Sequence, residues 1–193
     1  MDYFCKRIQP QTRLADNRTQ AQRHLNMVAI HSASTKPELI MRHALWHQGF
    51  RYRINDHRLP GSPDIVLPKY HTVIFVHGCF WHGHEGCKYY TIPKTNTDFW
   101  TAKVARNKER DQETWRQLEA KGWSVIIVWE CELKKAVLDA TVSRVQAEIL
   151  ANGEAHQKVS EERRKARRAY LQKRKMIRER ESALRDEIRG KFK

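Results

Sequence analysis

The sequence lacks any apolar run that could cross a membrane. Its longest uninterrupted aliphatic or aromatic runs are residues 73–76 and 125–129, whereas a membrane-spanning helix needs about 20 apolar residues. The N-terminal region is polar throughout and has no apolar core of signal-peptide length. We therefore expect a soluble, cytoplasmic protein with no membrane partner.

The sequence is also short of acidic residues and of cysteine. It has 22 Asp and Glu against 37 Lys and Arg over 193 residues, which gives a formal net charge of +15. Such an excess indicates a polyanionic partner, an acidic membrane surface or a confined basic tail. The four cysteines are poor disulfide candidates in a reducing compartment, so a cluster of them is first a candidate metal site.

The positive charge is unevenly distributed along the chain. Residues 156–193 hold 15 Lys and Arg against 6 Asp and Glu, so this segment carries +9 and the rest of the chain +6. It has no proline, and Tyr170, Ile177 and Leu184 recur every seven residues, which is compatible with a helix. The segment is either a solvated extension or an arm that contacts phosphates. We predict a polar lead over residues 1–22, one folded domain over 23–153 and a basic, helical tail over 154–193.

Capping residues and apolar periodicity predict the order of elements in the domain. Thr35 and Pro37 begin a helix that Gly49 ends, and residues 50–54 form a short strand. Residues 64–67 and 72–77 form a hairpin, a second helix runs from about Thr97 to Gly122, and a strand follows over 124–129. A last helix is expected from about residue 132 to 150. The fold class is therefore α/β, with a mixed sheet flanked by helices.

Three acidic residues stand where an active site could use them. Asp111 falls inside the apolar stripe of the second helix, where it either lies at the rim in a salt bridge or faces water, a cation or a histidine. Asp64 opens a strand, as a turn residue or as a Mg²⁺ ligand beside a backbone carbonyl of the partner strand. Helix capping already accounts for the presence of Glu38 near the start of the first helix, but its carboxylate could also join Asp64 in a metal site.

The segment from His77 to Cys87 concentrates metal-binding residue types. A closed Cys₃His set would be a structural zinc site, whereas the alternative is a group of buried free thiols. His77 and His82 remain outside that set and could transfer protons near neutral pH. The predicted zinc ligands are Cys79, His84, Cys87 and Cys131.

Three large aromatic side chains accompany these residues. Phe80 and Trp81 lie between predicted zinc ligands, and Trp100 begins the second helix. In a basic protein, such rings are candidates for stacking on nucleic-acid bases, and their alternative role is core packing.

The sequence resembles one known family over residues 23–150. The segments that carry the resemblance are RHLNMVAIHSASTKPE, LPGSPDIV, VIFVHGCFWHGHEGC, TDFW, NKERD and GWSVIIVWEC, and in this order they resemble the very short patch repair (Vsr) mismatch endonucleases. The resemblance implies a restriction-endonuclease-like sheet of the PD-(D/E)xK type with a structural zinc. It also implies a Mg²⁺-dependent nick in one strand of double-stranded DNA at a T:G mismatch, the product of 5-methylcytosine deamination.

The resemblance assigns roles residue by residue. The residue matching Asp64 binds Mg²⁺ with the backbone carbonyl matching Val76, the one matching His82 is the acid/base, and those matching Glu38, His77 and Asp111 orient water. Two departures are a valine at residue 76, where the family has threonine, and one extra residue between His84 and Cys87. The residues that match DNA contacts of the family are Met27, Phe80, Trp81, Trp100, Lys103 and Asn107.

Two other functions remain open at this point. One is a zinc-stabilised DNA-binding module without catalysis, and the other is a restriction-like nuclease with a different DNA target. The resemblance favours a bacterial, nucleoid-associated protein that acts as a monomer and has repair proteins as further partners.

Overall fold

The computed structural model describes residues 19, 22, 25 and 34–191, with the side chains of 183–184 and 186–191 left aside. The chain divides into two units, Met1–Thr35 and Lys36–Lys193, and every helix and strand discussed below belongs to the second. Within the part of the chain that the structure describes, no helix is both long and apolar enough to cross a membrane. The predicted DNA contact Met27 lies outside the described residues.

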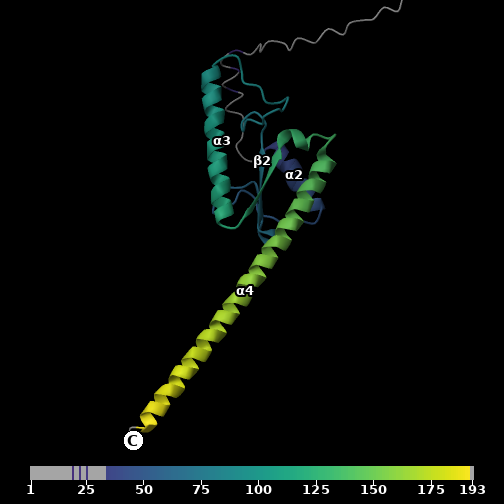
Figure 1. The fold of residues 1–193 in the computed structure, drawn as a ribbon. Helices are drawn as coiled ribbons and strands as arrows, with labels where there is room; N and C mark the ends of the chain where they lie inside the picture. Colours follow the sequence, from purple (N-terminus) through teal and green to yellow (C-terminus); the bar gives the residue numbers. More distant parts are fainter. Residues whose placement is uncertain (1–18, 20–21, 23–24, 26–33, 192–193) are drawn as a thin grey trace, which may run out of the picture. The chain divides into compact units, whose positions relative to one another are not determined.

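The second unit alternates helices and strands in the predicted order. It also contains two 3₁₀ turns, at Pro68–Tyr70 and Glu130–Leu133. The longer elements, shown in Figure 1, are α2 (Lys36–His47), β1 (Ile65–Leu67), β2 (Thr72–His77), α3 (Thr97–Ala120), β3 (Ser124–Trp129) and α4 (Leu138–Lys191).

The sheet is mixed, as predicted. Its strand order is β1-β2-β3; β1 pairs antiparallel with β2, and β2 pairs parallel with β3. The parallel register runs from Thr72 opposite Ser124 to His77 opposite Trp129. The carboxyl ends of both strands therefore meet at one edge of the sheet, where His77 and the residues that follow it lie.

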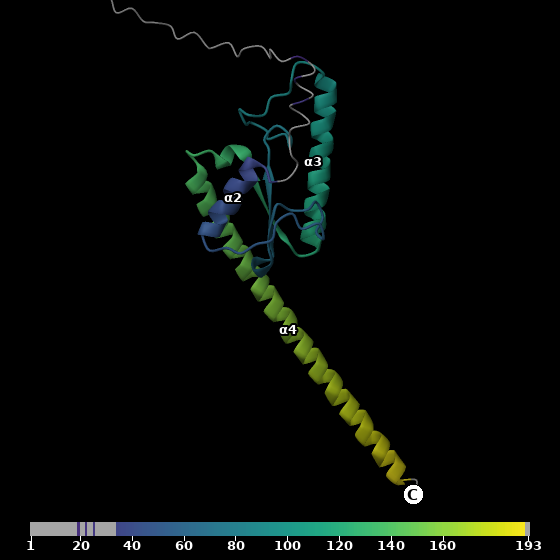
Figure 2. The same ribbon diagram turned by 180° about the vertical axis from the view of Figure 1, so that it is seen from behind.

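Helices cover both faces of this sheet (Figures 1 and 2). Met41 of α2 and Val145 of α4 pack with Ile74 in one buried cluster, whereas Leu118 of α3 packs with Val73 and Phe75 in the other. Successive residues of a strand point to opposite faces. His77 is in phase with Val73 and Phe75, so its side chain lies on the α3 face.

The short strand expected over residues 50–54 is reduced to one bridge between Arg53 and Val66. Asn55 has a left-handed backbone, with φ 44°, and this conformation ends the extended stretch. The prediction of a full strand there was wrong.

The last helix also differs from the prediction at both ends. It begins later, because residues 130–133 form a 3₁₀ turn in which the Glu132 carboxylate accepts the Trp129 N–H at 2.8 Å. It also continues to Lys191. A Cβ at Gly153 would lie 2.7 Å from the Tyr70 ring, so this glycine permits close packing of α4 on Tyr70 and does not end the helix. The predicted domain boundary at residue 153 stays a prediction, and it falls inside an unbroken helix.

Candidate active site and metal centre

Asp64 lies immediately before β1, beside the end of β2. Its Oδ2 accepts the backbone N–H of Val76 at 2.7 Å. The N–H and C=O of one residue in an extended strand point to the same side, so the Val76 carbonyl also faces Asp64. Burial, reinforced by the nearby Glu38, raises the pKa of Asp64 to about 6. A carboxylate that is poorly solvated in this way would be stabilised by a cation.

Arg42 joins two of the predicted acids, and sequence reasoning missed it. Its Nη2 donates to Glu38 Oε2 at 2.8 Å and to the backbone carbonyl of Asp64 at 3.1 Å. A third bond reaches Asn55 at 3.2 Å. Arg42 and Glu38 are both buried, so Glu38 is held by α2 through an ion pair. The spacing of Glu38 and Arg42, four residues apart on one helix, was the only local signal.

Asp111 faces a histidine. His82 Nδ1 lies 2.5 Å from Asp111 Oδ2, and Asp111 is buried in the middle of α3. Burial alone would raise the pKa of Asp111, but the hydrogen bond and charge of His82 outweigh it and hold that pKa below its usual value. The ionised carboxylate can only accept a hydrogen bond. His82 therefore carries its proton on Nδ1, and its Nε2 is left to accept or donate a proton.

His77 stacks on His82. The ring centroids are 3.7 Å apart, and the planes are inclined by 16°. His77 is buried, and burial lowers its pKa to about 3. Its Nδ1 has no hydrogen-bond partner among the described residues. One ligand atom from each of His77, His82 and Asp111 lies within 4.8 Å of the others, so these three side chains together could hold a water molecule or a cation.

Four further side chains form a second candidate metal site. The sulfur atoms of Cys79, Cys87 and Cys131 and a ring nitrogen of His84 all lie within 4.8 Å of one another. The Nδ1 of His84 is 3.6 Å from Cys79 Sγ and 3.4 Å from Cys131 Sγ. Burial raises the pKa of the Cys79 thiol to about 12, and a coordinated cation is the physical means of ionising such a thiol. The predicted Cys₃His set is thus brought together.

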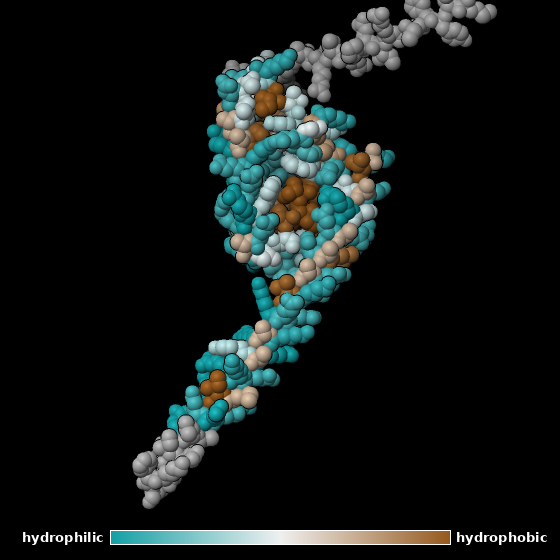
Figure 3. Space-filling model, in the orientation of Figure 1, coloured by the Kyte–Doolittle hydropathy of each residue, from teal (hydrophilic) through white to brown (hydrophobic). Residues whose placement is uncertain are grey.

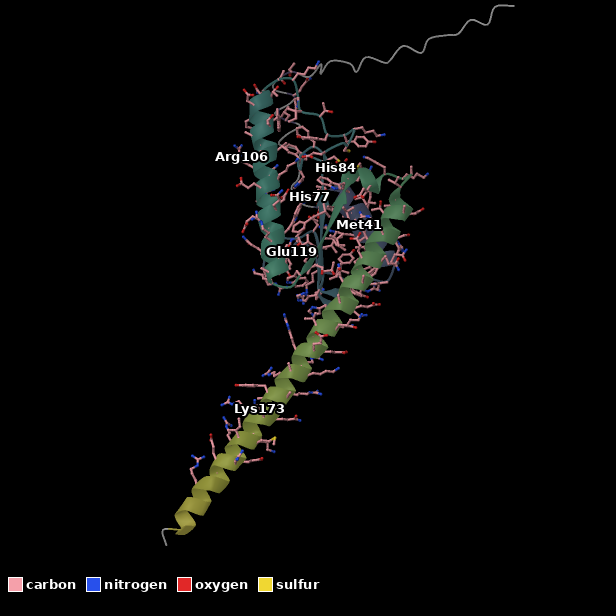
Figure 4. All side chains as sticks on the ribbon, viewed as in Figure 1. Met41, His77, His84, Arg106, Glu119 and Lys173 are labelled. Atoms are coloured by element: carbon pink, nitrogen blue, oxygen red, sulfur yellow. The ribbon has the colours of Figure 1, made fainter. Side chains whose placement is uncertain are left out.

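The loop between the two sites is packed tightly on α3. Gly83 has φ 62°, and a Cβ there would lie 2.6 Å from Val104 and 2.5 Å from Lys108. Glycine is therefore needed for close approach, which holds His82 against α3 and His84 toward the cysteines. His84 in turn stacks on Trp129, with centroids 4.1 Å apart. Figure 4 shows His77 and His84 at the same end of the sheet.

The three predicted DNA-contacting rings touch one another. Phe80 lies 5.2 Å from Trp81 and 5.3 Å from Trp100 between ring centroids, and all three are half-buried. They form a single aromatic cluster beside the first turn of α3. Phe99, whose side chain is more than half exposed, extends this cluster. Its ring centroid lies 5.2 Å from that of Trp100.

The two predicted base contacts on α3 differ in exposure. Lys103 is half-buried, whereas Asn107 is buried and its Nδ2 donates to the Trp81 carbonyl at 2.8 Å. Asn107 therefore fixes the loop that carries Trp81. Its predicted contact with a base stays a prediction.

Comparisons with known proteins identify relatives of this chain. Residues 15–88 match the family model described as DNA mismatch endonuclease Vsr. The type II nicking enzyme V.NmeAIP of Neisseria meningitidis is 52% identical over 137 residues, which are 70% of this chain and 97% of the relative. The DNA mismatch endonuclease Vsr of Escherichia coli is 40% identical over 147 residues, which are 75% of this chain and 94% of the relative.

Together with the buried acid and histidine groups of the site, these matches define an endonuclease that acts on DNA. More narrowly, the chain belongs to the Vsr family of DNA mismatch endonucleases.

Proposed function

We propose that this protein nicks one strand of double-stranded DNA beside a T:G mismatch, and so begins very short patch repair of deaminated 5-methylcytosine. The observation that carries the catalytic part is the His82–Asp111 pair, in which the carboxylate leaves His82 Nε2 available for proton transfer. Membership of a mismatch endonuclease family supports the substrate class.

We assign the catalytic cation site to Asp64 and the Val76 carbonyl, with Mg²⁺ as the ion. The chemistry of the donors supports this choice, because Mg²⁺ prefers oxygen ligands and keeps several waters. When bound, Mg²⁺ stabilises the negative charge that develops on the scissile phosphate and lowers the pKa of the attacking water. Because the pKa of Asp64 is raised, a proton and a cation compete for its carboxylate.

The other polar residues are assigned to proton transfer and to ordering water. His82 is the acid/base, and Asp111 fixes its tautomer and orientation. The free Nδ1 of His77 and the carboxylate of Glu38, held by Arg42, would each orient a water molecule. All of these groups lie at the carboxyl end of β2 or on the elements packed beside it.

We assign zinc to the cysteine and histidine cluster. Zn–S bonds of about 2.3 Å and Zn–N bonds of about 2.0–2.1 Å at tetrahedral angles separate nitrogen from sulfur by about 3.6 Å. The separations from His84 Nδ1, 3.6 Å to Cys79 and 3.4 Å to Cys131, fit that geometry. Four protein ligands leave no open position for water, so the role is structural.

The aromatic cluster of Phe80, Trp81 and Trp100 is proposed to enter the DNA beside the mismatch. Opening a base step costs less where pairing and stacking are already weakened, so a wedge selects a mismatch through deformability. Lys103, Asn107 and Met27 are proposed as further DNA contacts. The same proposal includes a restriction-endonuclease-like fold of the sheet, a monomeric state, repair-protein partners and action at the bacterial nucleoid.

An oligonucleotide nicking assay tests this function. The substrates are otherwise identical duplexes with T:G, fully paired or other mismatched positions, in Mg²⁺ and in EDTA. We expect one-strand cleavage of the T:G duplex in Mg²⁺ alone. Uniform cleavage of paired duplexes would indicate a nuclease with another target, and binding without cleavage would indicate a DNA-binding module.

A further inference from the structure

The basic end of α4 carries a straight row of arginines. Positions 163, 174 and 185 are eleven residues apart, and so are 167 and 178. Eleven residues are close to three turns of an α-helix, so residues at this interval drift by only about 20° around the axis. The row extends for roughly 33 Å, close to one turn of B-DNA. Its members are Arg163, Arg167, Arg174, Arg178 and Arg185.

The row keeps a clear excess of positive charge, with five arginines and one glutamate along it. All five side chains are exposed, and among the described residues none of them forms an ion pair with a carboxylate. The guanidinium carbon of Arg174 lies over the ring of Tyr170, 5.9 Å from the ring centroid. Glu161 and Glu179 lie roughly 100–160° around the helix from the row, whereas Glu181 lies on the row, between Arg178 and Arg185. Figure 3 shows that the visible surface of this end of α4 is mostly hydrophilic.

The row lies away from the active site. α4 passes Tyr70 at Gly153, and His156 stacks on His71 at 4.1 Å, so the helix leaves the sheet at the amino ends of β2 and β3. The active site lies at the carboxyl ends of β2 and β3. Each strand has six residues, so the two ends are about 20 Å apart. Figure 4 shows this separation between His77 and Lys173.

The two sites also lie on different faces of the sheet. α4 packs on the face of Met41 and Ile74, whereas His77 and Asp111 lie on the α3 face. A duplex lying across His82 and Asp111 would therefore lie on the face of the sheet opposite to the one on which α4 packs.

The relatives place the row outside the part of the chain that they share. The match to the Neisseria relative covers 97% of that protein but 70% of this one. The family model begins at residue 15, and a match of 137 residues from that position would end near Ala151. With those bounds, the arginine row would lie beyond the part of the chain that this relative shares.

We propose that the arginine row binds the phosphates of a second DNA segment, separate from the duplex that is cut. Arginine pairs with phosphate through two parallel hydrogen bonds, and five phosphate contacts would give a salt slope of about −4 to −5. A membrane surface fits less well, because an interfacial helix needs a broad apolar face and this one has isolated exposed apolar residues such as Tyr170 and Ile177. The inference requires only that the protein binds DNA, and not T:G specificity.

A bridging assay with the full-length protein tests the proposal. A paired duplex is fixed to beads, and capture of a free, labelled paired duplex is measured without added Mg²⁺ and without a chelator, so that cleavage is not needed and the zinc site stays intact. Two variants with the same change in net charge are compared with the wild-type protein. The row variant is Arg163→Gln, Arg167→Gln, Arg174→Gln and Arg178→Gln, and the control is Lys158→Gln, Lys165→Gln, Lys173→Gln and Arg180→Gln.

We expect the row variant to lose capture at least tenfold and the control to stay within about twofold. Circular dichroism checks that both variants stay helical, since glutamine is a good helix former. Phenylglyoxal, which modifies arginine, provides a second readout in the wild-type protein. It should modify the row arginines when one equivalent of duplex is present, and it should modify them much less when duplex is in excess.

Three results would overturn the inference. The wild-type protein could capture no second duplex, both variants could lose capture equally, or the row could bind anionic vesicles of phosphatidylglycerol without capturing DNA. A failure of T:G cleavage in the nicking assay would leave all of these readouts intact, so the two proposals fail separately.

Discussion

His82 Nδ1 and Asp111 Oδ2 are 2.5 Å apart although 29 residues separate them in the chain. The pair joins the loop after β2 to the middle of α3, and it fixes which nitrogen of His82 carries the proton. In the proposed mechanism, catalysis by His82 would depend on a carboxylate that need not touch DNA, and Asp111 would then be a positioning residue.

Asp111→Asn should lower kcat by about 10²–10⁴-fold, the range expected when a general acid/base is lost or misoriented. The asparagine amide can donate to Nδ1 and so favour the wrong tautomer of His82. Single-turnover nicking of a mismatched duplex measures this, and a binding assay should show an affinity within about twofold of wild type. Glu113→Gln, an exposed acid on the same helix, is the matched control. Undiminished cleavage by Asp111→Asn would contradict the role.

Cleavage should fall as pH drops through about 6, the pKa to which burial raises Asp64. The proton and Mg²⁺ compete for one carboxylate: below this pH the carboxyl is mostly protonated, and above it the carboxylate is free to bind metal. A tenfold increase in Mg²⁺ should therefore move the acidic limb of the pH profile down by about one unit. A profile that does not respond to Mg²⁺ would show that the limb belongs to another group.

Asp64→Asn should abolish cleavage and leave DNA binding largely intact, because it removes the charged oxygen ligand and keeps the shape of the side chain. Nicking and binding are measured on the same mismatched duplex. Asp98→Asn, an exposed acid in the first turn of α3, should retain activity. Retained turnover by Asp64→Asn would rule out its role as a metal ligand.

Cys131→Ser should lower zinc content and stability together, because metal binding at such a site contributes directly to folding. Zinc is measured by atomic emission on the purified protein, and the melting temperature by calorimetry. Cys5→Ser, outside the cluster, should keep one zinc per chain. Full zinc occupancy in Cys131→Ser would remove that residue from the ligand set.

Arg42→Met should destabilise the fold by about 3–5 kcal/mol, because it removes the buried ion pair that Arg42 forms with the Glu38 carboxylate. Urea unfolding measures the loss. The double variant Glu38→Gln with Arg42→Met should recover part of it, whereas Arg53→Met, whose side chain is 61% exposed, should change stability by less than about 0.5 kcal/mol. Equal stabilities of the single and double variants would show that the pair is not coupled.

The sequence predicted those parts of the site that leave a local signature. Asp111 interrupts an apolar stripe, and three cysteines with a histidine are unusual enough to indicate a metal before any contact is known. The same reasoning predicted a mixed sheet with a hairpin of residues 64–67 and 72–77, and the structure has that antiparallel pair beside a parallel pairing of β2 with β3.

Contacts between distant segments left no such signature. Arg42 looks like an ordinary surface residue of an amphipathic helix until Asn55 and Asp64 fold beside it. Gly153 looked like a helix end because its purpose depends on Tyr70, far earlier in the chain. The sequence does not indicate either contact, because arginine and glycine are common residue types and their roles depend on a partner that is distant in the chain.

The cysteine and histidine cluster takes three ligands from the loop after β2 and the fourth, Cys131, from beyond the end of β3. During synthesis, the whole of α3 and the last strand must leave the ribosome before the fourth ligand is available. A chain that stalls before residue 131, or pairs β3 in the wrong register, would hold an incomplete site. Tight metal retention would then report that the sheet has closed correctly, which gives the cell a chemical distinction between finished and unfinished nuclease.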